Sequence, residues 1–356
     1  MADDFSVKVL APPVQAFPLD FGRIQEMATP PQLNVFVICT MTKRFHGTGN
    51  RLLREVGGAS LSERFGGWAS RIERSRSPSI PAIDTYSGGH WSVVRSLNSS
   101  FAKSSSSERI WIVSAGYGLI SPADAIIPYG ATFAPGQPDS ISPVSSPEAS
   151  VAWWRLLTQW RPPALAPNAP RSVAAAVAKY PEASNLLVLS PDYYRALSED
   201  LRASLSQIAD PQKLIILSSD ERQVSDLAAH TVRVDARLQT YVGGARSSLG
   251  VRTARAVLQE LSGQPVTLGS FRAAMACLVN RHGVVQVFDR EPMTDAQVAD
   301  FINTELFQDA SVSSTRLLEK LRGSGRACER KRFHKLFTAA KERRTASLFA
   351  LNTVGA

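Results

Sequence analysis

The sequence predicts an α/β fold: a parallel four-stranded sheet flanked by helices, followed by a small all-α, helix-turn-helix-like domain. One observation is four short apolar runs with β-branched residues, which suit strands buried on both faces of a parallel sheet. A second is that hydroxyl residues, acids or tyrosines follow these runs, where open α/β sheets bind their ligands. A third is the change to short amphipathic helices late in the chain, which predicts a separate helical domain.

Each predicted strand ends in residues that could bind a ligand. The strands are expected at residues 33–39, 110–114, 186–189 and 213–217. Because the carboxyl ends of parallel strands meet at one edge of the sheet, we expect a single cleft there. The candidate residues at or just after these strand ends are Cys39, Lys43, Ser114, Tyr117, Ser190, Asp192 and Tyr193.

Length and composition predict three parts. At 356 residues the chain can form a sizeable core and a second small domain. Residues 1–31 are rich in proline and are expected to form an N-terminal arm. Residues 32–262 are the predicted α/β domain, and residues 263–356 the predicted helical, basic domain.

Net positive charge is concentrated in residues 316–344, near the end of the sequence. With 40 Lys and Arg against 31 Asp and Glu, the formal net charge is +9. Residues 316–344 hold eleven Lys and Arg and three Glu, a net +8, which leaves +1 for the remainder. Such a surplus favours a polyanionic partner. Within this segment Arg326, Arg330, Lys331 and Lys335 are predicted to contact DNA, although a solvated basic face is the alternative reading.

Several classes of site are not indicated. The three cysteines have no Cys-x-x-Cys spacing, so neither a disulfide framework, a metal site nor a cofactor is expected. No Walker loop, nucleophile elbow or complete dinucleotide fingerprint occurs. Because the first residues are acidic and no 18-residue apolar run exists, we expect a cytoplasmic protein.

Two glycine-containing segments are candidate ligand loops. Residues 115–118 place two glycines around Tyr117 directly after a predicted strand; this permits a sharp turn or close approach to a ligand, and an ordinary turn is the alternative. Residues 241–249 form a Gly-rich turn before a helix and include Arg246. This turn could hold a phosphate, although a plain helix start explains it equally well.

Three blocks of the chain carry motif residues, and together they cover about one third of the chain. The residues are Cys39 and Lys43 in the first block, residues 84–88 in the second, and Ser114, Ala115, Tyr117, Gly118, Leu119, Asp124, Pro128 and Tyr129 in the third. These blocks resemble a bacterial domain family of unknown function, distantly similar to the peroxide-stress DNA-binding proteins.

The predicted sheet is also similar in outline to the uracil-DNA glycosylase superfamily. Length, basic tail and motif blocks look like the bacterial anti-phage DNA glycosylases that excise glucosylated 5-hydroxymethylcytosine. This resemblance implies that double-stranded phage DNA with modified bases is the partner. It also implies that a base is flipped into the cleft and removed to leave an abasic site. The short water-activating motif of uracil glycosylases is missing, so the catalytic acid is open.

Under this hypothesis a carboxylate stabilises the oxocarbenium-like sugar and orients water. Asp84 is the first choice and Asp124 the second, with helix capping as the alternative for either. Lys43 could bind a phosphate or attack the sugar as an amine. The residues assigned to substrate binding are Cys39, Tyr86, Ser114, Tyr117, Tyr129, Ser190, Asp192, Tyr193 and Arg246, with Cys39 equally explained as a small core residue.

Two other functions fit the same residues. A DNA base transglycosylase would exchange the base instead of hydrolysing the bond. A non-enzymatic DNA-binding stress protein would use only the basic surfaces.

Overall fold

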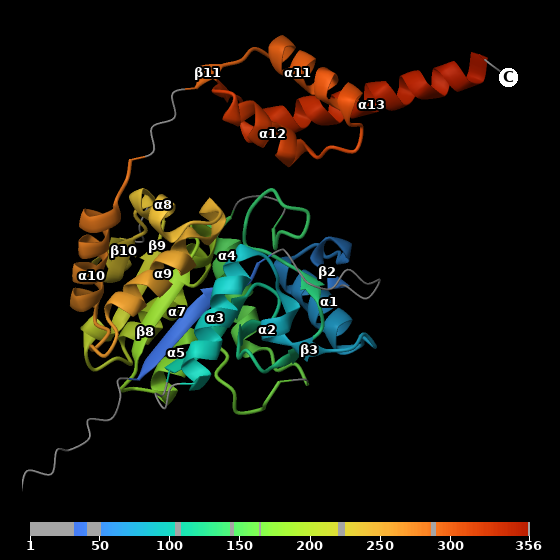
Figure 1. Cartoon of the computed structure of the whole chain (residues 1–356). Helices are drawn as coiled ribbons and strands as arrows, with labels where there is room; N and C mark the ends of the chain where they lie inside the picture. The colour runs from blue at the N-terminus through green and yellow to red at the C-terminus, as the bar shows by residue number, and fades with distance from the viewer. Residues whose placement is uncertain are drawn as a thin grey trace, which may run out of the picture. The chain divides into compact units, whose positions relative to one another are not determined.

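The computed structural model describes residues 32–40, 51–103, 108–142, 146–163, 165–219, 225–285 and 290–354. The chain forms two compact units, Met1–Val284 and Val285–Ala356 (Figure 1). The predicted N-terminal arm and Lys43 lie outside the described residues.

The first unit is built on one mostly parallel sheet of six strands in the order β10-β9-β8-β1-β4-β5. Five strands are parallel, and β5 runs antiparallel to β4. The central strand β1 pairs with both neighbours, since Val35 lies opposite Ile110 on one side and Leu186 on the other. The strands are β1 (Leu33–Ile38), β4 (Glu108–Ser114), β5 (Gly118–Ile120), β8 (Ser184–Leu189), β9 (Leu214–Ser218) and β10 (Thr231–Arg233).

The predicted four-stranded sheet needs correction, because the sheet has six strands. The four expected runs correspond to β1, β4, β8 and β9, which are neighbours in the sheet. The two additional strands are only three residues long, too short to give a periodic pattern. Gly118, with a φ of +75°, helps the chain turn back so that β5 pairs with β4.

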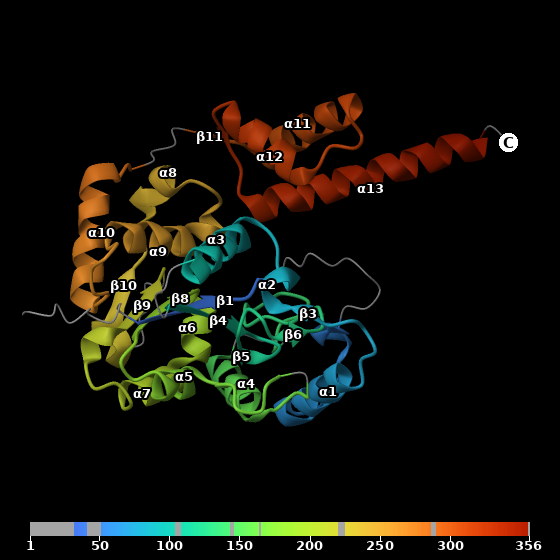
Figure 2. The same ribbon diagram turned by 60° about the horizontal axis from the view of Figure 1, so that its bottom comes forward.

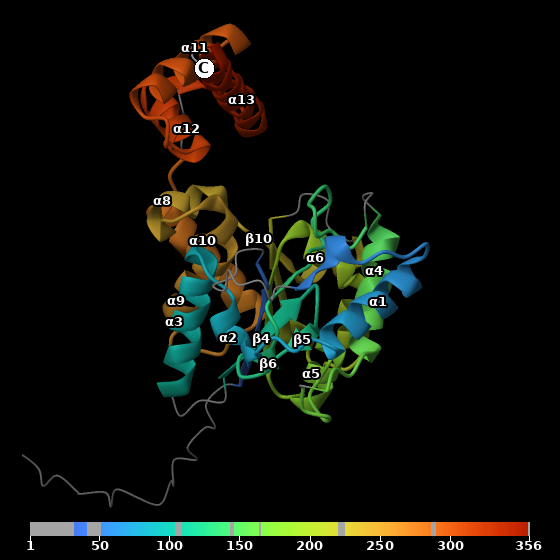
Figure 3. The same ribbon diagram turned by 90° about the vertical axis from the view of Figure 1, so that its right-hand side faces the viewer.

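Helices cover both faces of this sheet (Figures 2 and 3). One layer holds α3 (Gly89–Lys103), α9 (Leu249–Glu260) and α10 (Leu268–His282), where α9 packs against both others. The opposite layer holds α1 (Leu61–Glu73), α4 (Pro147–Gln159), α5 (Val173–Lys179), α6 (Pro191–Ala196) and α7 (Ser198–Leu205). Because both faces are covered, every residue of β8 and β9 is buried.

Short elements connect this framework. The remaining elements of the first unit are β2 (Arg51–Leu52), η1 (Leu53–Glu55), β3 (Ile80–Pro81), α2 (Ala82–Thr85), β6 (Ala125–Ile126), β7 (Tyr129–Gly130), η2 (Pro211–Lys213), η3 (Ser225–His230), η4 (Ala236–Leu238), α8 (Gln239–Val242) and η5 (Arg246–Ser248).

The division between the units falls later than the predicted boundary at residue 262. Helix α10 follows that position, yet its residues Phe271, Met275 and Leu278 are buried in the core of the first unit. The described chain after residue 263 contains helices and two short strands, and its first helix, α10, completes the α/β unit.

In residues 290–354, the second unit contains three helices and two short parallel strands. Its elements are β11 (Glu291–Pro292), α11 (Asp295–Gln308), α12 (Ser314–Gly323), β12 (Arg326–Ala327) and α13 (Arg330–Val354). Val298, Ile302, Leu317, Leu321 and Phe333 are among the residues of its separate core.

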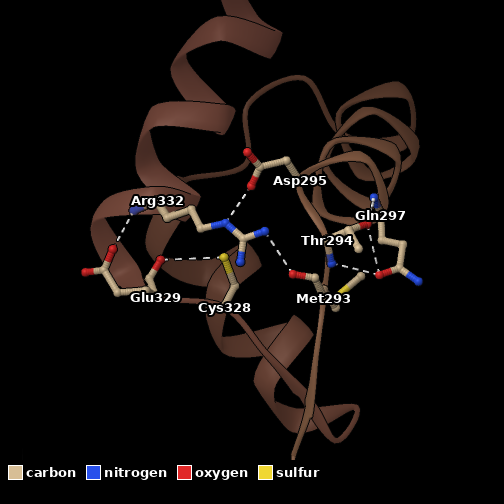
Figure 4. A network of polar contacts seen from close by, with 7 residues as sticks. All are labelled: Met293, Thr294, Asp295, Gln297, Cys328, Glu329 and Arg332. Carbon is tan, nitrogen blue, oxygen red and sulfur yellow. Dashed lines mark hydrogen bonds and ion pairs between the residues drawn. The ribbon is translucent and has the colours of Figure 1, made fainter.

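Polar contacts fix the start of α13 in this unit (Figure 4). Glu329 accepts hydrogen bonds from the backbone N–H groups of Lys331 and Arg332 at 3.0 and 2.8 Å. Arg332 donates to Asp295 at 2.5 Å and to the carbonyl of Met293 at 2.9 Å. Arg332 therefore ties α13 to α11. No helix in the described part of the chain is both long and apolar enough to cross a membrane.

Candidate functional site

A cavity of about 890 Å³ lies at the carboxyl ends of the neighbouring strands β1, β8, β9 and β10. This is the edge at which open α/β sheets bind ligands, and the volume is that of a small-molecule site. Of the predicted site residues, the cavity brings together Cys39, Ser190, Asp192, Tyr193 and Arg246. We call this cavity the cleft.

Two of these side chains contact each other across the ends of β1 and β8. The Sγ atom of Cys39 lies 3.0 Å from the phenol oxygen of Tyr193. Burial, followed by the proximity of Cys39, raises the pKa of Tyr193 well above its usual value. Its phenol is therefore neutral at physiological pH and can donate a hydrogen bond.

Two carboxylates line the cleft. Asp192 lies in the first turn of α6, and its Oδ1 accepts a hydrogen bond from Arg195 at 2.7 Å. Asp235 is the N-cap of η4 and accepts from the guanidinium of Arg237 at 2.7 to 3.1 Å. The hydrogen bond from Arg237 lowers the pKa of Asp235, which favours its charged form.

Asp235 was not among the predicted site residues. It follows β10, a strand of three residues, so no apolar run in the sequence marks its position. The sequence feature that could have indicated Asp235 is a short alternation of apolar and polar residues just before it. In the structure Val232 and Val234 are buried, and Arg233 between them is exposed.

Two arginines add positive charge to the cleft. Arg233 comes from the end of β10 and Arg246 from η5, and both are exposed residues in its lining. Exposed guanidinium groups at a cavity of this kind suit bidentate contacts with phosphate.

The motif around residues 114–129 is placed in the core and does not line the cleft. The phenol oxygen of Tyr129 lies 2.8 Å from that of Tyr86 and 2.6 Å from Ser114 Oγ. Tyr117 donates to the carbonyl of Ile127 at 3.3 Å and accepts from its N–H at 3.1 Å.

All three tyrosines are at most 1% exposed. Tyr86 stacks on Trp91 with ring centres 4.3 Å apart, and Tyr117 stacks on Trp160 at 5.8 Å. Burial raises the pKa of Tyr86, Tyr117 and Tyr129, so their hydroxyl groups stay neutral. Tyr86 and Tyr117, both assigned to substrate binding, therefore present no open ring face to a ligand in this structure.

The two carboxylates predicted to be catalytic also lie away from the cleft lining. Asp84 is an exposed residue of α2. Asp124 holds a turn, since its Oδ2 accepts from the N–H of Ser121 at 2.7 Å and its own carbonyl accepts from Ala82 at 2.8 Å. The structure therefore assigns local roles to Asp124, whereas Asp192 and Asp235 supply the acids of the cleft.

His90 is a further cleft residue that was not predicted as a site residue. It is the second residue of α3, lines the cleft and is 9% exposed. A ring N–H donates to the carbonyl of Ile38, while Nε2 has no hydrogen-bond partner among the described residues. Burial lowers the pKa of His90 to about 4.

The pKa of His90 predicts a loss of folding stability in acid. Between pH 4 and pH 6.5 the unfolded chain holds a proton at His90 that the folded chain does not. The stabilisation is thus complete above pH 6.5, and about 3 kcal/mol is lost as the pH falls from 7 to 4. Urea unfolding followed by tryptophan fluorescence measures this loss in the first unit, because all six tryptophans lie between residues 68 and 160.

Two variants provide the comparison. His90→Gln is expected to reduce the difference between the unfolding free energies at pH 7 and pH 4. His282→Gln changes a partly exposed residue of α10 and should keep the wild-type difference. An unchanged difference in His90→Gln would show that His90 is not the titrating group.

The described part of the chain has no group of three or more His, Cys, Asp and Glu residues that could hold a metal ion. Comparisons with known proteins give no match, whether with protein-family models, curated proteins or solved structures.

Proposed function

We propose that the protein is a DNA N-glycosylase that flips a modified base of phage DNA into the cleft and excises it. The modified base we propose is glucosylated 5-hydroxymethylcytosine, as the motif resemblance implies. The observation that carries the proposal is the cleft itself, which combines the carboxylates of Asp192 and Asp235 with the exposed arginines Arg233 and Arg246.

The cleft chemistry fits hydrolysis of an N-glycosidic bond. As the bond breaks, the sugar gains positive charge, which a nearby carboxylate stabilises. Asp192 is the proposed carboxylate, because it lines the cleft from the first turn of α6, directly after β8. Water adds to the C1′ atom, its proton passes to the carboxylate, and the departing base takes up a proton.

Size and polarity support a flipped nucleotide with a bulky substituent. The cavity of about 890 Å³ lies near the upper end of the range of roughly 300–1,000 Å³ for small-molecule sites. Tyr193 supplies a neutral hydroxyl, and Arg233 and Arg246 supply cations for the flanking phosphates. Extrusion of the base costs a few kcal/mol, which such contacts must offset.

The decisive experiment incubates the purified protein with three forms of one DNA: unmodified, hydroxymethylated and glucosylated. We expect abasic-site aldehydes and free modified base only with the glucosylated DNA. Mass spectrometry of the DNA separates hydrolysis from exchange, because a transglycosylase leaves a replacement base at the site. Binding without aldehydes or exchanged base would contradict the glycosylase and favour a non-enzymatic DNA-binding protein.

The second unit is the proposed site of electrostatic DNA binding. Arg326, Arg330, Lys331 and Lys335 are all exposed and lie in β12 or the first two turns of α13. Helices α12 and α13 with the intervening turn resemble a helix-turn-helix in order, which supports a contact between α13 and DNA. Arg332 is excluded from this set because Asp295 pairs with it.

Replacing Arg330, Lys331 and Lys335 together with glutamine is expected to weaken DNA binding at every sequence. If each contacts one phosphate, the slope of log affinity against log salt should become shallower by roughly 2.7, or 0.9 per contact. Fluorescence anisotropy over a series of salt concentrations measures the slope. Lys320→Gln is the control, since Lys320 pairs with Glu305, and an unchanged slope in the triple variant would place the DNA contact elsewhere.

A further inference from the structure

His90 lines the cleft, and its Nε2 is a buried hydrogen-bond acceptor without a partner among the described residues. Gly88, with a φ of +87°, and Gly89 precede it, and α3 begins at Gly89, so the helix start carries the imidazole to the end of β1. The side chain is 9% exposed, and its Nε2 has no hydrogen-bond partner among the described residues. Buried polar atoms without a partner are rare and call for an explanation.

The contacts of the ring define what Nε2 can do. Since a ring N–H donates to the carbonyl of Ile38 and Nε2 has no described partner, the donor is Nδ1. Burial lowers the pKa of the imidazole to about 4, so the ring is neutral at physiological pH. In the neutral ring with a proton on Nδ1, Nε2 carries only a lone pair. It can accept a hydrogen bond but cannot donate one.

Three other polar side chains of the cleft have partners within the protein. Cys39 contacts Tyr193, Asp192 accepts from Arg195, and Asp235 accepts from Arg237. His90 differs from these three because its Nε2 acceptor has no partner among the described residues.

We propose that His90 Nε2 accepts a hydrogen bond from an N–H or O–H group of the bound ligand and so selects bases that carry such a donor. This inference rests on the proposed function, in which the ligand is a flipped, modified base. Two groups of that base have the required chemistry: the exocyclic amine of a cytosine-type ring and the hydroxyls of an attached hexose. A site built around an unpaired acceptor rejects analogues that lack the donor, because the acceptor is then left buried and unpaired.

Four free nucleosides separate the two sources of the donor. They are 5-hydroxymethyl-2′-deoxycytidine, 5-hydroxymethyl-2′-deoxyuridine and the glucosylated form of each. The two nucleosides of the first pair differ in the exocyclic amine, which the uridine replaces with a carbonyl oxygen while gaining a ring N3–H. Glucosylation replaces the hydroxymethyl O–H with the hydroxyls of the hexose. Isothermal titration measures their dissociation constants for wild type, for His90→Phe, which keeps a ring without an acceptor, and for His90→Gln, whose amide oxygen can replace Nε2.

We expect His90→Phe to weaken the nucleosides that carry the recognised donor by about 10- to 100-fold and to leave those without it unchanged. His90→Gln should restore part of the loss. A preference between cytidine and uridine that disappears in His90→Phe identifies the amine. A preference for the glucosylated nucleosides that disappears in His90→Phe identifies the hexose as the recognised donor. Equal weakening of all four nucleosides, or none, overturns the inference.

The binding experiment is independent of catalysis. If wild type discriminates among the nucleosides, His90→Phe loses that preference and wild type releases no base from any DNA, the glycosylase proposal fails and the role of His90 stands. If wild type cleaves glucosylated DNA and His90→Phe retains every preference, the role of His90 fails and the glycosylase proposal stands. Circular dichroism of each variant verifies that it is folded.

Discussion

Replacing Asp192 with asparagine is expected to lower kcat for base excision by about 10²- to 10³-fold, with little change in DNA affinity. Asparagine keeps the size of the side chain but removes the negative charge that stabilises the oxocarbenium-like sugar. The charge develops mainly in the transition state, so the loss should appear in kcat and not in ground-state binding. Single-turnover release of the free base measures the chemical step, and anisotropy measures binding.

Three asparagine variants identify the carboxylate. Asp84→Asn changes an exposed acid that does not line the cleft and should leave kcat close to the wild-type value. Asp235→Asn removes the other acid of the cleft. If Asp84→Asn is inactive while Asp192→Asn cleaves at the wild-type rate, the cleft is not the catalytic site.

The sequence predicts the central sheet because its strands are buried on both faces. β1, β4, β8 and β9 each carry an apolar run long enough to recognise, and β8 and β9 are buried throughout. β5 and β10 depend on tertiary pairing with β4 and β9, and three residues carry no usable periodicity. The strand count was wrong for that reason.

The predicted ends of the strands identified only some of the residues that line the cleft. Cys39 and Asp192 reach it because β1 and β8 end there. The loop after β4 does not line the cleft, because two tryptophans enclose it. The indole N–H of Trp68 donates to the carbonyl of Gly116 at 2.9 Å, and that of Trp153 donates to the carbonyl of Ala115 at 2.8 Å. These tryptophans lie far from the motif in sequence, so the motif alone gives no sign that it is enclosed.

His90 and Asp235 line the cleft, but the sequence pattern did not predict them as site residues. His90 enters from a helix start and Asp235 from a loop after a three-residue strand, so neither follows a recognisable apolar run. Their place in the cleft depends on the packing of α3 and β10 onto the sheet. Chain topology, and not local pattern, brings them together.

Replacing Arg171 with alanine is expected to destabilise the first unit by about 4–5 kcal/mol, because it removes a buried cation and several charge-assisted hydrogen bonds. Arg171 is 3% exposed and donates to the carbonyls of Tyr117, Leu119 and Trp160. Burial lowers its pKa to about 10, so the guanidinium is still charged at pH 7. Without it, carbonyls of the loop after β4 and of the end of α4 lose their donor inside the core.

Urea unfolding followed by tryptophan fluorescence tests this expectation, with Arg155→Ala as the matched control. Arg155 is 60% exposed and pairs with Glu199, and an exposed ion pair contributes about 0–1 kcal/mol. Both arginines are near α4, so the comparison isolates burial. A loss below about 1 kcal/mol in Arg171→Ala would mean that water replaces the guanidinium at these carbonyls. A large loss would explain why the motif after β4 has a structural role: its backbone is held by Arg171 and cannot also open to a ligand.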